Sequence, residues 1–153
     1  MILTATPSQI RNLFLHTRPT YTVAEAAEAI GMSVDDVRGW MEVGELEGVD
    51  TRDGVVLPWA ELVSFAMGFW EQEEIEEALG AEAAEAIPAL LRLCDLEVRI
   101  PRLEVVALER LAARDGKSVD AVLSAELRDL VSAQSEWLAS VIPGFASALS
   151  WPY

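Results

Sequence analysis

The stretch that decides the fold is residues 96–131, LEVRIPRLEVVALERLAARDGKSVDAVLSAELRDLV. It opens with a run of alternating side chains, which predicts a short, half-buried strand. Glu97 and Arg99 occupy the polar face of this strand, and Pro101 ends it because proline has no backbone N–H to donate. The apolar face consists of Leu96, Val98 and Ile100.

Two helices are predicted after the strand. The first ends at Gly116, with Arg114 in its last turn, and Ser118 can cap the second. The apolar residues of the first helix are Leu103, Val106, Ala107, Leu108 and Leu111, and those of the second are Val119, Val122, Leu123, Leu127, Leu130 and Val131. A strand and two helices of this length bury little surface alone, and the strand leaves an edge unpaired. The simplest solution is a second copy that pairs strand to strand about a two-fold axis.

The strand VRIP, the junction LxxLAARDGKSV and the helix AELRDLV resemble the ribbon-helix-helix family of the MetJ, Arc and CopG type. The resemblance implies an obligate intertwined homodimer whose two-stranded ribbon enters the DNA major groove. It implies that Glu97 and Arg99 face bases, with Arg102 as a further DNA contact. Lys117 and Ser118, at the start of the second helix, would face a phosphate. The implied dimer interface is Leu96, Val98 and Ile100.

A second pattern lies in residues 21–68. Thr22 and Glu25 form a capping box for a helix that ends at Gly31, and Ser33 can cap the helix that follows. Two short helices joined by such a turn predict a helix-turn-helix.

A hairpin with Asp53-Gly54 as its turn comes next, and Pro58 starts another helix. The segments YTVAEAAEAIGMSVDDVRGW, RDG and LPWAEL resemble the winged helix-turn-helix of the MerR and excisionase-like families. That resemblance implies that the second helix enters the major groove and that the hairpin touches the DNA backbone. The implied contacts are Arg38 on the helix and Arg52 at the hairpin tip.

The net charge of −15 bears on both resemblances, because phosphate contacts need cations. Residues 71–95 hold eight acidic residues and one basic residue, whereas residues 96–153 hold eight acidic and six basic residues. The helix-turn-helix also carries a set of acidic residues that weaken contact with phosphates: Asp35, Asp36, Glu42, Glu45 and Asp53. Two functions therefore stand. One is a dimeric regulator of transcription that binds double-stranded DNA, an autoregulator of the antitoxin kind. The other is an acidic protein-interaction module that keeps these folds without binding DNA.

The expected architecture is mainly α-helical, with a small β-hairpin and one strand that pairs with a second chain. The expected parts are an N-terminal helix with the winged helix-turn-helix (1–70), an acidic helical linker (71–95), the ribbon-helix-helix (96–142) and an apolar tail (143–153). Phe145 and Trp151 in the tail are candidate contacts for a cognate protein such as a toxin. The alternative is that the tail folds back over the chain's own core or the dimer partner.

No enzyme, cofactor or metal site is predicted, because the sequence has no nucleophile beside a base and no glycine-rich phosphate loop. His16 and Cys94 are its only histidine and cysteine, and the apolar neighbours of Cys94 predict a buried side chain. The N-terminus lacks the features of a signal peptide, and no apolar run is long enough for a membrane span. A cytoplasmic protein without a membrane partner is expected.

Overall fold

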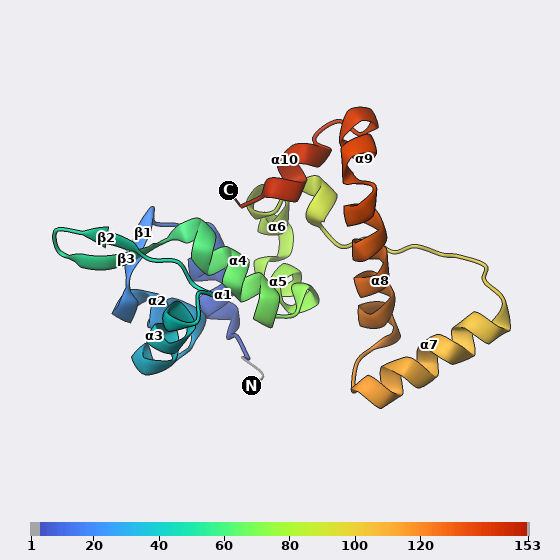
Figure 1. Ribbon diagram of the computed structural model, residues 1–153, viewed down its shortest axis with the longest axis horizontal. Helices are drawn as coiled ribbons and strands as arrows, with labels where there is room; N and C mark the ends of the chain where they lie inside the picture. The colour runs from blue at the N-terminus through green and yellow to red at the C-terminus, as the bar shows by residue number, and fades with distance from the viewer. Residues whose placement is uncertain (1–3, 153) are drawn as a thin grey trace. The chain divides into compact units, whose positions relative to one another are not determined.

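The computed structural model describes residues 4–152, which are mainly helical with one small antiparallel sheet (Figure 1). Two units can be distinguished. The first comprises residues 4–93 together with 150–152, and the second comprises Cys94–Leu149. Residues 1–3, part of the N-terminal stretch considered above for a signal peptide, and Tyr153 of the tail lie outside the described residues.

The first unit opens with three short helices, and the caps of the second and third are the predicted ones. They are α1 (Pro7–Leu15), α2 (Val23–Ile30) and α3 (Val34–Glu42). Thr6 and Thr22 form capping boxes, and the Ser33 hydroxyl accepts the Asp36 N–H at 3.1 Å. Gly31 closes α2 with φ +73°, a left-handed conformation that glycine adopts without strain.

The sheet has three strands in the order β1-β3-β2: β1 (Thr20–Thr22), β2 (Val49–Thr51) and β3 (Gly54–Pro58). The predicted hairpin is β2–β3, with Thr51 opposite Gly54 across the turn. Strand β1 was not predicted. It pairs antiparallel with β3, so that Tyr21 lies opposite Leu57 and both side chains are buried. The next helix, α4 (Trp59–Phe69), begins directly after Pro58, as predicted.

The acidic stretch expected to be a linker is instead part of the first unit. It forms α5 (Gln72–Leu79), α6 (Ala83–Ala86) and the 3₁₀ turns η1 (Gly80–Glu82) and η2 (Ala89–Leu91). Ile75 and Ile87 are buried in the same core as the N-terminal helices. Arg11 of α1 donates to the Ala78 carbonyl at 3.2 Å and pairs with Glu82 at 2.6 Å. Most of the acidic residues face solvent, while the apolar residues spaced between them pack inward.

The core of the first unit therefore draws on every helix and on two strands. Its largest fully buried side chains are Ile10, Leu13, Ile30, Val37, Leu46, Leu57, Leu62, Val63, Ile75, Leu79 and Ile87.

The second unit consists of α7 (Arg102–Asp115), α8 (Val119–Ala133), α9 (Ser135–Val141) and most of α10 (Phe145–Ser150). The junction between α7 and α8 is the predicted one. Gly116 ends α7 with φ +63°, and the Ser118 hydroxyl accepts the Ala121 N–H at 3.1 Å. Within the described part of this unit, the buried apolar residues are only Ala112 and Ala148.

Candidate nucleic-acid interface

Residues 93–100, which include the predicted strand, form neither helix nor strand in the single chain. The side chains of Leu96, Val98 and Ile100 are 75%, 52% and 42% exposed. Among the described residues, no backbone hydrogen bond involves the N–H or carbonyl groups of 94–100. An extended stretch with open backbone groups and alternating apolar side chains is a ready template for pairing with another strand.

The predicted DNA contacts of the second unit are exposed cations. Arg99, Arg102 and Lys117 all face solvent, and none of them forms an ion pair within residues 4–152. Arg114, by contrast, pairs with Asp115 at 2.7 Å, and this hydrogen bond lowers the pKa of the Asp115 carboxyl below 3.8. Arg99 and Arg102 are therefore open to an anionic partner, whereas the Lys117 charge also helps to lower the pKa of the nearby Asp115 carboxyl.

The start of α8 combines two of the predicted contacts. Ser118 uses its hydroxyl oxygen to cap the helix, and the Lys117 N–H donates to the Ala112 carbonyl at 2.9 Å. The side chain of Lys117 remains exposed beside the helix N-terminus. Asp120 in the first turn of α8 partly offsets the positive end of the helix dipole.

The candidate contacts of the first unit lie in more acidic surroundings. Arg38, on the exposed face of α3, has Asp35 of the same helix 3.9 Å away. Arg52 lies at the tip of the β2–β3 hairpin, next to Asp53, and forms no ion pair in the described chain. Both arginines are exposed, as a DNA-contacting role requires. The acidic residues of the sequence prediction are exposed with them: Asp35, Asp36, Glu42, Glu45 and Asp53.

Trp151 of the tail packs against the first unit's own core. Its ring lies 6.4 Å from the Phe14 ring in a stacked arrangement and 6.3 Å from the Trp59 ring in an edge-on one. Trp59 is held in place by its indole N–H, which donates to the Leu13 carbonyl at 2.8 Å. Trp151 therefore follows the alternative in which the tail folds back over the chain's own core. A partner could use this side chain only by displacing it from Phe14 and Trp59.

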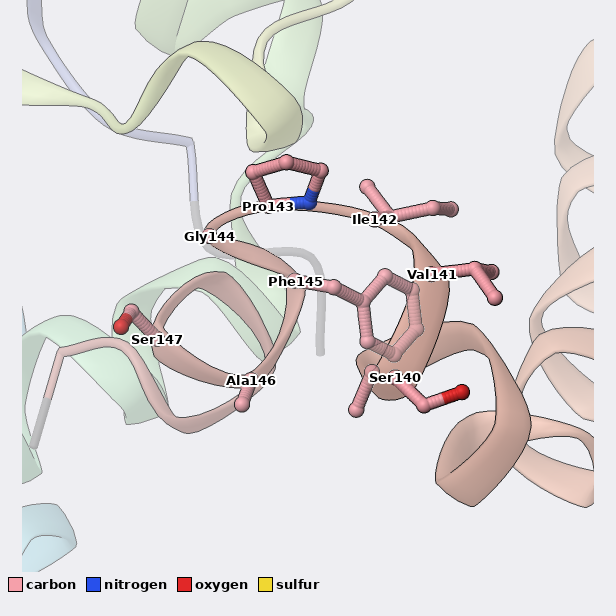
Figure 2. Close-up of a pocket in the computed structure, with 9 residues that line it drawn as sticks. Ser140, Val141, Ile142, Pro143, Gly144, Phe145, Ala146 and Ser147 are labelled. Atoms are coloured by element: carbon pink, nitrogen blue, oxygen red, sulfur yellow. The ribbon is translucent and has the colours of Figure 1, made fainter.

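Phe145, the other tail candidate, lies in the second unit. Figure 2 shows its ring turned back toward Val141 and Ser140, beneath the turn that joins α9 to α10. A shallow hollow at this corner is lined by one continuous stretch, residues 139–147. Phe145 is half-buried there, so residues of its own chain already cover part of its ring.

The prediction for Cys94 was wrong, since its side chain is exposed. The leucines before it explain the error, because Leu90 and Leu93 are themselves 54% and 57% exposed and form no core around it.

In residues 4–152, no three His, Cys, Asp or Glu side chains are placed to hold a metal ion. No described helix is both long enough and apolar enough to cross a membrane.

Sequence reasoning missed the aromatic site of Phe14 and Trp59. The usable signal was the tryptophan directly after Pro58, at the first position of α4, together with a tryptophan near the C-terminus.

Comparison of the chain with protein-family models, curated proteins and solved structures finds no match in any of the three.

Proposed function

We propose that this chain is a homodimeric, DNA-binding regulator of transcription, an autoregulator of the antitoxin kind. In this proposal residues 96–142 form a ribbon-helix-helix, with the strand at 96–100 supplied once by each copy. Residues 21–68 form a winged helix-turn-helix that lies on neighbouring DNA or grips it.

The observation that carries the proposal is the state of the second unit. Its buried apolar residues in the described chain are two alanines, while its helices and the 96–100 segment expose Leu103, Leu111, Leu127 and Leu130 among others. A unit of this kind gains a core only by burying these faces against another molecule. A second copy satisfies both the open backbone of 96–100 and the apolar helix faces.

Charge supports DNA as the ligand of this dimer rather than of the first unit alone. Dimerisation doubles the number of cations without an ion-pair partner, since each copy brings Arg99 on the strand, Arg102 at the start of α7 and Lys117 before α8. Arg38 of the first unit is already shared with Asp35. We therefore assign the main phosphate and base contacts to the ribbon and the start of α8, and a flanking role to α3 and the hairpin.

The test is fluorescence anisotropy of the purified chain on DNA from upstream of its own gene, with salt titration and a scrambled duplex as control. Sequence-dependent binding that weakens as salt rises is expected, and the slope counts the phosphates contacted. Arg99→Ala combined with Lys117→Ala should weaken binding and reduce the salt slope by about 1 for each phosphate that is no longer neutralised. The matched control is Arg38→Ala with Arg52→Ala, which should have the smaller effect. Unchanged affinity and slope in the first double variant would contradict the proposal.

A second function is favoured by one specific observation, the acidic exposed face of α3 and the hairpin. A helix with Asp35 and Asp36 in its first turn and Glu42 at its end repels phosphate and suits a basic protein surface. In this alternative the chain is a protein-interaction module. A stable co-purifying basic partner, combined with no DNA binding even at low salt, would establish it.

A further inference from the structure

Three aromatic side chains of the first unit form a cluster between α3 and α4. The centroid of the Trp40 ring lies 5.6 Å from that of Phe65 and 5.3 Å from that of Phe69, in edge-on arrangements, and the two phenylalanine rings are 4.6 Å apart. Phe65 is buried, whereas Trp40 and Phe69 are half-buried. The aromatic cluster therefore has an inner part in the core and an outer part at the surface.

We propose that the outer part of this aromatic cluster and the adjacent flank of α3 form a docking surface for a basic amphipathic helix of a partner protein. The flank consists of Asp36, Gly39, Trp40 and Val43, whose spacing of i, i+3, i+4 and i+7 places them on one side of the helix. This inference rests on the second of the two functions proposed above. It adds the surface that binds the basic partner and the kind of segment that this surface accepts.

Two glycines leave helix backbone uncovered beside the aromatic cluster. Gly39 precedes Trp40 in α3, and Gly68 precedes Phe69 in α4. In the described chain, a Cβ added to either glycine would meet no atom within 4 Å, apart from the adjacent residues and the backbone of its own helix. Glycine in a helix is less stable than alanine, because it loses more backbone freedom on folding. The described residues do not fill the space that the two glycines leave, so a second molecule can enter it.

The exposed apolar surface continues past the end of α3. Val43, the residue that follows this helix, is 68% exposed. The Trp40 carbonyl accepts the N–H of Glu45 at 3.0 Å and that of Leu46 at 3.3 Å, and these hydrogen bonds hold the residues after α3 against its last turn. Val43 thus lies one turn beyond Trp40 on the same side of the helix.

The edge of this surface is acidic. The Glu47 N–H donates to the Glu61 carboxylate of α4 at 3.1 Å, which ties the segment after α3 to the first turn of α4. Residues 33–47 hold five acidic residues and one basic residue, Arg38. Arg38 is two positions from Trp40, and residues with this spacing lie on opposite sides of a helix. The one cation of this stretch therefore points away from the aromatic cluster.

Charge identifies the class of partner. A surface with this excess of carboxylates repels the DNA backbone, and it also repels a second copy of itself. A segment with lysine or arginine around an apolar stripe matches both the acidic edge and the aromatic centre. Helices that dock in this way present apolar anchors at i, i+3, i+4 and i+7. The uncovered backbone at Gly39 and Gly68 admits such a helix close to α3 and α4.

Peptide binding to the full-length chain tests the proposal. The probe is a fluorescently labelled synthetic peptide with leucine at i, i+3, i+4 and i+7 and lysine at its other positions, and anisotropy measures its affinity. Binding that weakens as salt rises is expected. One control peptide has the same composition with its leucines scattered, and the other has glutamate in place of lysine. Both should bind at least about tenfold more weakly. Equal binding of either control would overturn the proposal.

Glycine substitutions locate the bound peptide. Gly39→Gln and Gly68→Gln each place a side chain in the open space, so each should weaken peptide binding by about tenfold or more. Circular dichroism should show that both variants fold, because glutamine favours a helix more than glycine does. Ala24→Gln, at an exposed position of α2, is the matched control and should bind as the wild type does. Folded glycine variants that bind the peptide like the wild type would contradict the docking surface.

Charge reversal tests the acidic edge. Glu45→Lys combined with Glu47→Lys should weaken peptide binding by about tenfold, because two attractive charges become repulsive. The control, Glu77→Lys combined with Glu85→Lys, makes the same change in net charge at other exposed positions of the first unit and should have the smaller effect. An equal loss in both variants would mean that net charge alone attracts the peptide, and the docking surface would be wrong.

The outcomes separate this inference from the proposed functions. A chain that binds DNA in the anisotropy test, but does not bind the lysine and leucine peptide, would leave the first function standing and overturn the docking surface. A co-purifying basic partner that binds the wild type and Gly39→Gln equally would leave the second function standing and overturn this site for it. Peptide binding that is lost in both glycine variants and kept in Ala24→Gln would support the docking surface.

Discussion

The two units of this chain differ in how they dispose of their apolar side chains. Residues 4–93 bury leucine, isoleucine and valine from helices α1 to α5 in one core, whereas residues 94–149 bury two alanines and leave most of their large apolar side chains exposed. The first unit carries a long run of acidic residues and still has a core of its own, because its charges lie outside that core. Self-sufficiency therefore follows from where the apolar residues point rather than from how many there are.

The largest effect is expected for a charge placed on the exposed face of the second unit. Val98→Asp would bury two unpaired carboxylates in each dimer, which we expect to weaken association by about 3 kcal/mol or more. The matched control is Val43→Asp in the first unit, where a valine that is 68% exposed should tolerate the change within about 0.5 kcal/mol. Sedimentation equilibrium of both variants measures the difference. Equal behaviour of the two would remove the distinction between the units.

Truncation of a buried side chain in α5 tests whether this helix belongs to the core of the first unit. Ile75→Ala in α5 should destabilise this unit by about 2–5 kcal/mol, because Ile75 is fully buried and the substitution leaves a cavity. Glu77→Ala, on the exposed side of the same helix, serves as the control and should change stability by less than about 0.5 kcal/mol. Urea unfolding monitored by tryptophan fluorescence reads both. If Ile75→Ala proved as harmless as its control, α5 would be a linker after all.

Removal of the Trp151 side chain from the tail should have an intermediate effect on the stability of the first unit. Trp151→Ala removes two aromatic contacts, with Phe14 and Trp59, and should cost the first unit about 1–3 kcal/mol. Trp137→Ala removes a side chain that is 63% exposed in the second unit, and it should leave the first unit unchanged. Near-ultraviolet circular dichroism should report loss of the aromatic signal only in the first variant. No change in that signal would mean that the tail is not docked in solution.

The smallest effect concerns the capping box of α2. Hydrogen bonds from Thr22, with Arg18 beside it, hold the pKa of the Glu25 carboxyl below 4.5. Because the folded-state pKa is lowered, the stabilisation is complete above pH 4.5 and is lost as the pH falls through the lowered value. Glu25→Gln should therefore lower the melting temperature slightly near neutral pH and not at strongly acidic pH. A difference that stays constant across the titration would mean that the carboxylate charge contributes nothing.

Local signals predicted most of the elements. The caps at Thr22, Ser33 and Ser118 and the glycine stop at Gly116 were predicted because a cap depends on neighbours within one helical turn. The hairpin turn before Gly54 was predicted for the same reason. The mainly helical fold with a small sheet could therefore be predicted from the sequence.

Long-range packing could not be predicted in the same way. Strand β1 exists because Tyr21 meets Leu57, which are far apart in the chain. The spacing of Ile75 and Leu79 showed an apolar face on α5 but not the surface that this face covers. Trp151 was a candidate for any apolar partner until its contact with Trp59 was seen. The candidate DNA contacts were found from family resemblance, and their use by DNA stays a prediction.

Hydrogen–deuterium exchange of the full-length chain, over as wide a range of protein concentration as detection allows, tests the difference between the two units most directly. We predict that amides of residues 96–100, α7 and α8 gain protection as the concentration rises, because only the dimer pairs the strands and buries the helix faces. Amides of α2 and α4 should exchange at the same rate throughout. Strong, concentration-independent protection of 96–100 in a chain that sediments as a monomer would contradict the proposed dimer.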